Sequence, residues 1–527
     1  MVSKNDFTSR RDLLKYLGAA GITTAASGLM VPSYVLAEKQ ATELPEMPKY
    51  GGKIRVATTS SSTKDTLDPA KASLGTDYAR IYMLYSGLTQ FNESLGADLA
   101  LAEKFETEDQ QIWHLELRKG VTFHDGKTLT AQDVKYSLLR HKDPALTSRV
   151  APIAEQFETI NVTDKYSLTI KLTSPNADLP TILASSNFCI VSEGTTNFTS
   201  AANGTGPYRL KEFSPGVRTV VEKNPNYWKE GKPYLQEIEL VGIYDEPSRV
   251  NALLSGDLQL AVAINPRSTK RVKGSGKCDV LQTESGLYNN LIMRVDKFPT
   301  NNRHFVTAIK YMLDRELIKR ALFRGFATVA NDHPVPPSHK YYHHELAQRP
   351  YDLDIAKYYL KKSGMEGARL PIYATPAAEG SVEMAALLQL SAIECGFNLG
   401  INRVPADGYW SNHWMKHAMG FGNINPRPSL DELFSLFYKS DAPWNESGWS
   451  NPQFDQLLLQ ARGEGDEIKR KQMYWDMQEL ISVHCGVSVP VFMNLIDGYD
   501  KRLKGFKAIP TGGLMGYMFA EHVWWDA

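Results

Sequence analysis

The stretch WHLELRKGVTFHDGKTLTAQDVKYS, residues 113–137, combines a strand, a hairpin turn and the start of a helix. Apolar and polar residues alternate over 113–117, as they do in a strand with one buried face. Turn sequences at 118–120 and 124–127 bracket residues 121–123, and the Asp-Gly pair within the second favours the left-handed backbone of a hairpin. Thr130, with Asp133 three residues later, suits a helix N-terminus. The stretch therefore predicts strand and helix side by side.

Outward from this stretch, strands and helices alternate along the whole chain. Strand-like patterns occur at 53–57, 168–172, 219–221, 238–243 and 487–491. Helical spacing of apolar residues begins at Arg303 and recurs at 353–363, 454–462 and 469–483. The first half is strand-rich and the second more helical, without internal repeats. Because 527 residues exceed what one core usually serves, we expect two or more α/β domains.

The N-terminus carries the features of an export signal. Residues 8–15, Thr-Ser-Arg-Arg-Asp-Leu-Leu-Lys, match the twin-arginine motif. Residues 16–35 are diluted by Gly, Thr and Ser and are too weakly apolar to hold a bilayer span. We therefore predict that residues 1–37 are a twin-arginine signal peptide, cleaved after Ala37, and that the mature protein is periplasmic. An ordinary basic N-terminus on a cytoplasmic protein is the alternative.

Charge and cysteine content narrow the classes of partner. The 59 basic and 59 acidic residues balance, so the chain offers no basic field for nucleic acid. The four cysteines are far apart and lack the CxxC spacing of zinc or redox sites. They are Cys189, Cys278, Cys395 and Cys485. We predict neither a sulfur-bound metal nor a specific disulfide.

Several segments, in order, resemble the signature stretches of the dipeptide- and oligopeptide-binding proteins of ABC importers, family 5 of the bacterial extracellular solute-binding proteins. The resemblance covers almost the whole mature chain, and residues 97–137 are its most specific part. The other segments are GTGPY at 204–208, NPNYW at 224–228, NALLSGD at 251–257, and residues 303–315 and 351–364.

The resemblance implies an α/β, two-lobed periplasmic-binding-protein (Venus flytrap) fold of the large class, with an extra subdomain inserted in lobe one. Lobe one is expected at 45–285 plus 495–527, and lobe two at 286–494. The implied role is the substrate-binding component of an ABC importer, which captures a small ligand between its lobes and delivers it to permease and ATPase subunits. A monomer without a cofactor or catalytic activity is expected.

The sharpest candidate ligand residues lie in the loop 420–431. In peptide-binding relatives an acidic residue of lobe two pairs with the ligand's α-amine, but this loop has Asn423 and Asn425 where an aspartate is expected. Arg427 either offers a bidentate fork to a carboxylate or phosphate, or bridges Asp431 or the acid after it. Asp431 either receives a ligand amine or begins a helix. We expect a small anionic or zwitterionic ligand, such as a short peptide, a modified amino acid or an opine-like conjugate.

Other candidates come from segments expected to face the cleft, and each also has a structural interpretation in the core, the hinge or a loop. Rings before the loop are suited to stacking on a ligand. Amides at the expected crossing between lobes are suited to hydrogen bonding. The candidates are Trp410, Trp414, Tyr288, Asn289, Asn290, Thr76, Asp77 and Leu514.

Other functional classes stay open. Residues 61–64, Ser-Ser-Thr-Lys, fit the Ser-x-x-Lys pattern of penicillin-recognising acyl-enzyme hydrolases, but Lys-Thr-Gly is absent and the serine follows a strand instead of opening a helix. A periplasmic chaperone-like protein would share the fold and differ in lacking a ligand. The pair His343 and His344 lacks the spacing of a metal site, although relatives that bind haem or chelated nickel leave a metal-containing cargo open.

Overall fold

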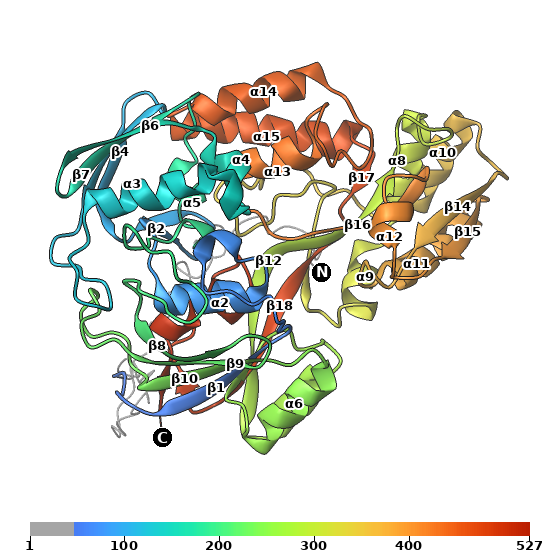
Figure 1. Cartoon of the computed structure of the whole chain (residues 1–527). Coiled ribbons are helices and arrows are strands. Elements are labelled where there is room, and N and C mark those ends of the chain that lie inside the picture. Colours follow the sequence, from blue (N-terminus) through green and yellow to red (C-terminus); the bar gives the residue numbers. More distant parts are fainter. Residues whose placement is uncertain (1–46, 527) are drawn as a thin grey trace, which may run out of the picture. The chain divides into compact units, whose positions relative to one another are not determined.

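The computed structural model describes residues 47–526 (Figure 1). The strands are β1 (Lys53–Thr58), β2 (Thr89–Phe91), β3 (Ala97–Leu99), β4 (Ala102–Thr107), β5 (Ile112–Leu117), β6 (Phe157–Asp164), β7 (Ser167–Leu172), β8 (Tyr208–Ser214), β9 (Arg218–Lys223), β10 (Glu237–Gly242), β11 (Leu260–Ala261), β12 (Cys278–Met293), β13 (Ala327–Val329), β14 (Arg369–Ala374), β15 (Asn398–Arg403), β16 (Met419–Ile424), β17 (Val487–Ser488), β18 (Val491–Asp500), β19 (Leu503–Lys504) and β20 (Trp524–Trp525). The helices are α2 (Gly75–Leu84), α3 (Ala131–Leu139), α4 (Ala151–Ala154), α5 (Leu179–Ile182), α6 (Glu246–Ser255), α7 (Thr269–Gly274), α8 (Arg303–Tyr311), α9 (Arg315–Ala321), α10 (Leu353–Ser363), α11 (Ser381–Glu394), α12 (Tyr409–Asn412), α13 (Leu430–Phe437), α14 (Pro452–Gly463), α15 (Glu467–His484) and α16 (Gly513–Gly516).

The local predictions for residues 113–137 are confirmed. Strand β5 buries alternate residues, and the amide of Phe123 closes the following turn by donating to the Lys127 carbonyl at 2.8 Å. Gly126 has a φ of 93°, which explains the glycine. Asp133 caps α3, because its carboxylate accepts from the amide and the hydroxyl of Thr130 at 2.9 and 2.8 Å.

The predicted strand at 487–491 is divided in two. Strand β17 ends at Ser488 and β18 begins at Val491. Between them, Pro490 has no amide hydrogen to donate to a ladder. The carbonyls of Val489 and Pro490 accept instead from Asp332 at 3.2 Å and Ala330 at 3.0 Å. A proline within an apolar run thus interrupts the strand.

The largest sheet has ten strands, in the order β16-β12-β18-β11-β1-β10-β9-β8, with β13 beside β18 and β17 beside β12. Its two long strands, β12 and β18, pair antiparallel along most of their length. Their register is irregular between Thr283 and Leu287. Figure 1 shows that β12 and β18 connect the part of the molecule around α2 and β1 with the part around α8 and β16.

Buried apolar residues form cores on either side of this irregularity. Three clusters draw their buried members from residues 54–280 and 496–523. Two others draw theirs only from residues 288–493. One of these first three clusters is the core of the four-stranded sheet β4-β5-β7-β6. Since each cluster stays on one side, the described chain divides into two packing groups joined by β12 and β18.

No helix within residues 47–526 is long and apolar enough to cross a membrane. The predicted signal peptide, residues 1–37, lies outside the described residues. All four cysteines lie inside them, as buried free thiols.

Candidate functional site

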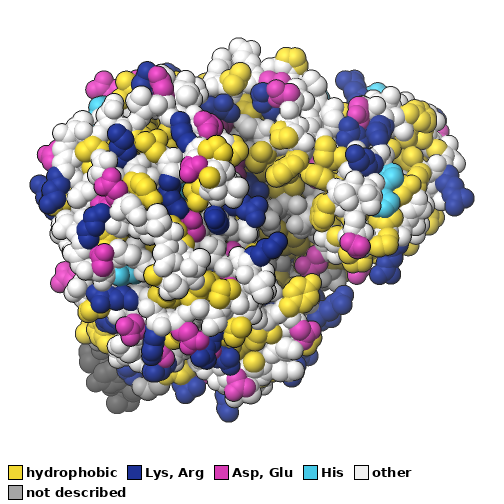
Figure 2. All heavy atoms as spheres, viewed as in Figure 1, with side chains coloured by type: hydrophobic (Ala, Val, Ile, Leu, Met, Phe, Trp, Pro, Cys, Tyr) yellow, Lys and Arg dark blue, Asp and Glu magenta, His cyan; other side chains and the backbone are white. Residues whose placement is uncertain are grey.

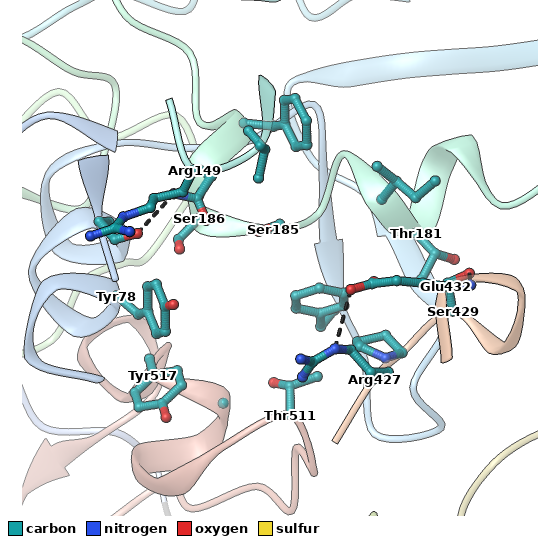
Figure 3. Close-up of a pocket in the computed structure, with 18 of the residues that line it drawn as sticks. Tyr78, Arg149, Thr181, Ser185, Ser186, Arg427, Ser429, Glu432, Thr511 and Tyr517 are labelled. Carbon is teal, nitrogen blue, oxygen red and sulfur yellow. Dashed lines mark hydrogen bonds and ion pairs between the residues drawn. The ribbon is translucent and has the colours of Figure 1, made fainter. Parts of the chain in front are cut away.

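A pocket of about 380 Å³ opens where the two packing groups meet. Helix α2 and the segments 181–188 and 511–517 provide one side, and residues 426–432, which lead into α13, provide the other. Pockets of this size accommodate small solutes. Figure 2 shows a recess in this face with hydrophobic and basic side chains around it, and Figure 3 shows the residues that line the pocket.

Arg427 is held at the edge of this pocket by Glu432. The guanidinium Nε lies 3.2 Å from Oε1 of Glu432, and Nη1 donates to the Pro426 carbonyl at 3.2 Å. Burial raises the pKa of Glu432, and the positive charge of Arg427 opposes that rise. Because a quarter of the Arg427 side chain stays exposed, the outer face of the guanidinium is available to an anion.

Two tyrosines face Arg427 across the pocket (Figure 3). The rings of Tyr78 and Tyr517 meet edge to face, with centroids 5.4 Å apart. Burial raises the pKa of Tyr517 to about 12, so its hydroxyl stays neutral and can donate a hydrogen bond. Burial and then Asp77 raise the pKa of Tyr78, while Arg427 and the exposed Arg149 lower it. Both guanidinium groups therefore act electrostatically on this hydroxyl.

A second pocket, of about 450 Å³, shares Tyr517 with the first. Its apolar lining includes Leu287, Phe323, Phe326, Met493 and Leu514. Asp497 on β18 lines it and is 3% exposed. Burial raises the pKa of Asp497 to about 7, although the amides of Leu514 and Ala263 donate to its carboxylate. This pocket therefore combines an apolar lining with a buried acid.

Of the predicted ligand residues, Arg427 lines the first pocket and Leu514 the second. Thr76 and Asp77 are buried at the start of α2. The hydroxyl of Thr76 is 2.5 Å from that of Thr58, and Asp77 forms an ion pair with Arg80 at 2.7 Å. These two side chains are engaged within the first packing group.

The three residues predicted at the crossing lie on β12, where polar contacts join them to neighbouring elements. The hydroxyl of Tyr288 is 3.2 Å from that of Tyr438. Asn289 donates to the Glu379 carbonyl and accepts from Asn423 at 2.5 Å. Asn290 donates to the buried Glu446 at 2.6 Å. The structure thus brings Asn289 and Asn423 together.

The remaining candidates line neither of these two pockets. Trp410 is 43% exposed, and Trp414 donates from Nε1 to Glu446 at 2.7 Å. Asn425 is exposed. Asp431 lies in the first turn of α13 and forms an ion pair with Arg462 at 2.9 Å.

Sequence reasoning did not single out Tyr78, Arg149, Glu432, Tyr517 or Asp497 as pocket residues. Tyr78 directly follows Asp77 on α2, so the prediction of Asp77 as a ligand residue pointed to the right helix but to the neighbouring side chain. Arg149 lies in irregular chain, and Tyr517 follows a left-handed turn in which Leu514 and Met515 have φ near 55°. No periodic pattern marks such positions.

Two packing groups joined by paired strands, with solute-sized pockets between them, define a two-lobed binding protein. Residues 97–446 match the family model described as "Bacterial extracellular solute-binding proteins, family 5 Middle", which is more than half of the chain. The chain therefore belongs to the family 5 bacterial extracellular solute-binding proteins.

Individual relatives agree with this assignment. The glutathione-binding protein GsiB of Pectobacterium atrosepticum is 25% identical over 517 residues, covering 94% of this chain and 96% of the relative. The ABC transporter substrate-binding protein CtaP of Listeria monocytogenes has a similar structure, with a TM-score of 0.80 and 21% identity. The match covers 91% of this chain and 100% of CtaP. DppA of Helicobacter pylori, solved with the peptide STSA, has a TM-score of 0.72 and 22% identity. That match covers 91% of this chain and 99% of DppA. The comparisons give no support to the alternative of a penicillin-recognising hydrolase.

Proposed function

We propose that this chain is the periplasmic substrate-binding component of an ABC importer, which captures a small carboxylate-bearing solute, delivers it to a permease and catalyses no reaction. The observation that carries this proposal is the position of Arg427. It comes from residues 286–494, and it faces Tyr78 and Tyr517, which come from the other part of the chain. A ligand carboxylate between them would receive charge-assisted hydrogen bonds from both sides.

The lobes follow the same division. Lobe one comprises residues 45–285 and 495–527, and lobe two residues 286–494. The separation of the apolar cores and the irregular pairing between Thr283 and Leu287 support these boundaries. A ligand that contacts both lobes stabilises the closed form by its differential affinity, and closure signals loading to the permease.

The ligand class rests on Arg427 and on two relatives. One is named for glutathione, and another was solved with a peptide; both ligands carry carboxylates. Residues 97–446 carry the family match, while Asn423 and Asn425 replace the expected aspartate. We therefore favour a short peptide or a modified amino acid.

Export by the twin-arginine route completes the proposal. N-terminal sequencing of the protein from a periplasmic fraction should begin at Glu38. Replacing Arg10 and Arg11 together by lysine should leave the uncleaved chain in the cytoplasm. A first residue far from Glu38, or export unaffected by the double change, would contradict this route.

Ligand capture is tested first by native mass spectrometry of the mature protein, with identification of any small molecule released on denaturation. Titration calorimetry with that molecule then compares the wild type with Arg427→Ala, whose affinity should fall at least about tenfold, the effect of losing a hydrogen bond to a charged group. Arg218→Ala is the matched control, because Arg218 also pairs with a glutamate but lies exposed on β9. Equal affinity in wild type and Arg427→Ala would reject the role of Arg427.

If the purified protein is empty, thermal unfolding is measured against a library of peptides, amino-acid conjugates, sugars and metal chelates. A raised melting temperature identifies the ligand class, because a ligand that binds only the folded state stabilises it. An empty protein whose melting temperature no compound moves would favour the chaperone-like alternative.

A further inference from the structure

The segment that carries Arg427 is short of backbone hydrogen-bond donors. Pro426 and Pro428 flank Arg427, and a proline has no amide hydrogen to donate. Side-chain contacts are therefore needed to fix this segment. His339 of the same packing group makes one of them. Its Nδ1 accepts from the Tyr341 amide at 3.1 Å, so its Nε2 carries the hydrogen that it donates to the Pro428 carbonyl at 3.2 Å.

Ser429 makes a second contact, and this one reaches the other packing group. Its hydroxyl accepts from the Glu432 amide at 3.2 Å, which caps α13, and donates to Oδ2 of Asp178 at 2.6 Å. A hydroxyl has one hydrogen to donate and lone pairs to accept with, so it makes both contacts at once. Glu432 in turn pairs with Arg427 at the edge of the first pocket (Figure 3). Ser429 thus joins Asp178 to the residues that hold the guanidinium.

Asp178 uses both carboxylate oxygens on residues of the second packing group. It precedes α5, but its side chain caps none of the amides of that helix. Oδ2 accepts from Ser429, and Oδ1 accepts from Nη2 of Arg470 at 2.8 Å. All three side chains are buried, and hydrogen bonds to a charged group are strong in such surroundings. Asp178 therefore offers Ser429 an acceptor in a fixed position.

In the proposed division of the chain, this acceptor comes from lobe one, while the segment that it orders belongs to lobe two. A backbone contact makes the same crossing, because the Ala177 amide donates to the Arg462 carbonyl at 2.8 Å. When the lobes separate, Ser429 loses Asp178. The cap of α13 and the contact of His339 remain, since both lie within lobe two. The segment therefore has one fixed contact fewer in the open form.

We propose that Asp178 is a positioning residue: acting through Ser429, it fixes the segment that carries Arg427, so that the carboxylate site is completed when the lobes close. This inference rests on the proposed function. Asp178 itself does not line the first pocket. An entering ligand first meets a loosely held guanidinium, and closure then orients it. Selectivity for a carboxylate therefore arises on closing, because the closed form gains the differential affinity.

Matched variants separate this role from general stabilisation of the fold. Ser429→Ala removes the link together with the cap of α13. Asp178→Ala combined with Arg470→Met removes the acceptor, keeps the cap and leaves no buried charge of this ion pair unpaired. Asn451→Ala is the control, because Asn451 caps α14 of the same lobe by accepting from the Phe454 amide at 3.1 Å. Its described hydrogen bonds stay within residues 440–455.

Calorimetry on the full mature protein compares dipeptides and tripeptides with their C-terminal amides, after thermal shift has identified the peptides that bind. The wild type should prefer the free acid by about tenfold or more, as expected for a hydrogen bond to a charged group. In Ser429→Ala and in Asp178→Ala/Arg470→Met this preference should fall to about threefold or less, and combining all three changes should lower it no further. Asn451→Ala should keep the full preference.

Hydrogen exchange of the empty protein gives a readout that needs no ligand. The Glu432 amide, which donates to Ser429, should exchange about tenfold faster in Asp178→Ala/Arg470→Met than in the wild type, because Ser429 has lost the contact that orders it. In Asn451→Ala this amide should exchange at the wild-type rate. An unchanged rate in Asp178→Ala/Arg470→Met would overturn the link from Asp178 to the segment of Arg427.

The binding data distinguish failure of this inference from failure of the proposed function. If Ser429→Ala and Asp178→Ala/Arg470→Met lose affinity equally for acids and amides and keep the preference, Asp178 only holds the lobes together, and its positioning role is overturned while carboxylate capture stands. If the wild type binds amides as tightly as acids, or binds no compound at all, carboxylate capture fails. The positioning role then fails with it, whatever the exchange rate at Glu432.

Discussion

Replacing Asp178 by Asn would remove one charge of a buried ion pair that joins α5 to α15. Asp178 Oδ1 lies 2.8 Å from Nη2 of Arg470, and Ser429 donates to Oδ2 at 2.6 Å. The side chains are 9% and 4% exposed. Burial alone would raise the pKa of Asp178, but Arg470 and Ser429 outweigh it and keep the pKa below its usual value. Under the proposed lobe boundaries, Asp178 belongs to lobe one and Arg470 to lobe two. The ion pair therefore stabilises the closed contact between the two lobes.

The size of the effect follows from what remains after the substitution. Arg470 would keep the Ala461 carbonyl at 2.8 Å and the rings of Tyr341 and Tyr474, each 5.5 Å away, but lose its counter-charge. Leaving one buried charge unpaired costs about 3–5 kcal/mol. Separation of the two segments lets water reach Arg470, so the cost applies to the closed contact. At about 1.4 kcal/mol per factor of ten, its opening becomes at least about a hundredfold more frequent.

Hydrogen exchange measures this opening directly. The amide of Ala177 donates to the Arg462 carbonyl at 2.8 Å across the same contact. Its exchange should accelerate about a hundredfold in Asp178→Asn, while amides of β1 keep their protection. Asp441→Asn is the control, because its ion pair with Lys439 is exposed and should leave exchange at Ala177 unchanged. An unchanged rate at Ala177, or an equal acceleration in β1, would refute the proposed local role of the pair.

Three further predictions concern the cores. Burial raises the pKa of Glu446 to about 7, above its unfolded value near 4.3, so the stability that the protonated carboxyl contributes is lost as pH rises from 5 to 7. In urea unfolding, the free energy of unfolding of Glu446→Gln should therefore rise relative to that of the wild type by up to about 1.4 kcal/mol per pH unit over this range. Equal pH dependence of the two proteins would contradict this. Gly422→Ala should lower the melting temperature, because a Cβ there would lie 2.1 Å from Oε1 of Glu446, whereas Gly274→Ala, where a Cβ meets nothing within 4 Å, should not. Since all four cysteines are buried free thiols, a thiol reagent should label none in the native protein and four after denaturation; fewer than four would indicate a disulfide.

Local sequence patterns predicted the elements whose information lies within a few residues. The strand at 113–117, the turn at Gly126 and the helix begun by Thr130 depend on alternation, backbone conformation and capping, which neighbouring residues determine. The prediction of one strand over 487–491 was wrong because it relied on the apolar residues of this segment and did not account for Pro490, which has no amide hydrogen to donate to a neighbouring strand.

The pockets depend on contacts that no local pattern contains. Arg427, which lines the first pocket, could be proposed as a ligand residue because its loop resembles a family segment and its guanidinium suits an anion. Tyr517 meets Tyr78 across more than four hundred residues of sequence, and Asp497 and Glu379 line one pocket only after the chain has crossed between the packing groups twice. Such pairings depend on how distant parts of the chain pack together, which residue spacing does not encode.

The path of the chain through the two lobes also fixes the order in which the site is made during synthesis. Tyr78 is translated early, Arg427 late, and Thr511 and Tyr517 later still, although all four line one pocket. A ribosome-bound chain therefore has no complete pocket until the segment after β18 has emerged. A solute held in this pocket would therefore indicate that the chain has folded as far as Tyr517.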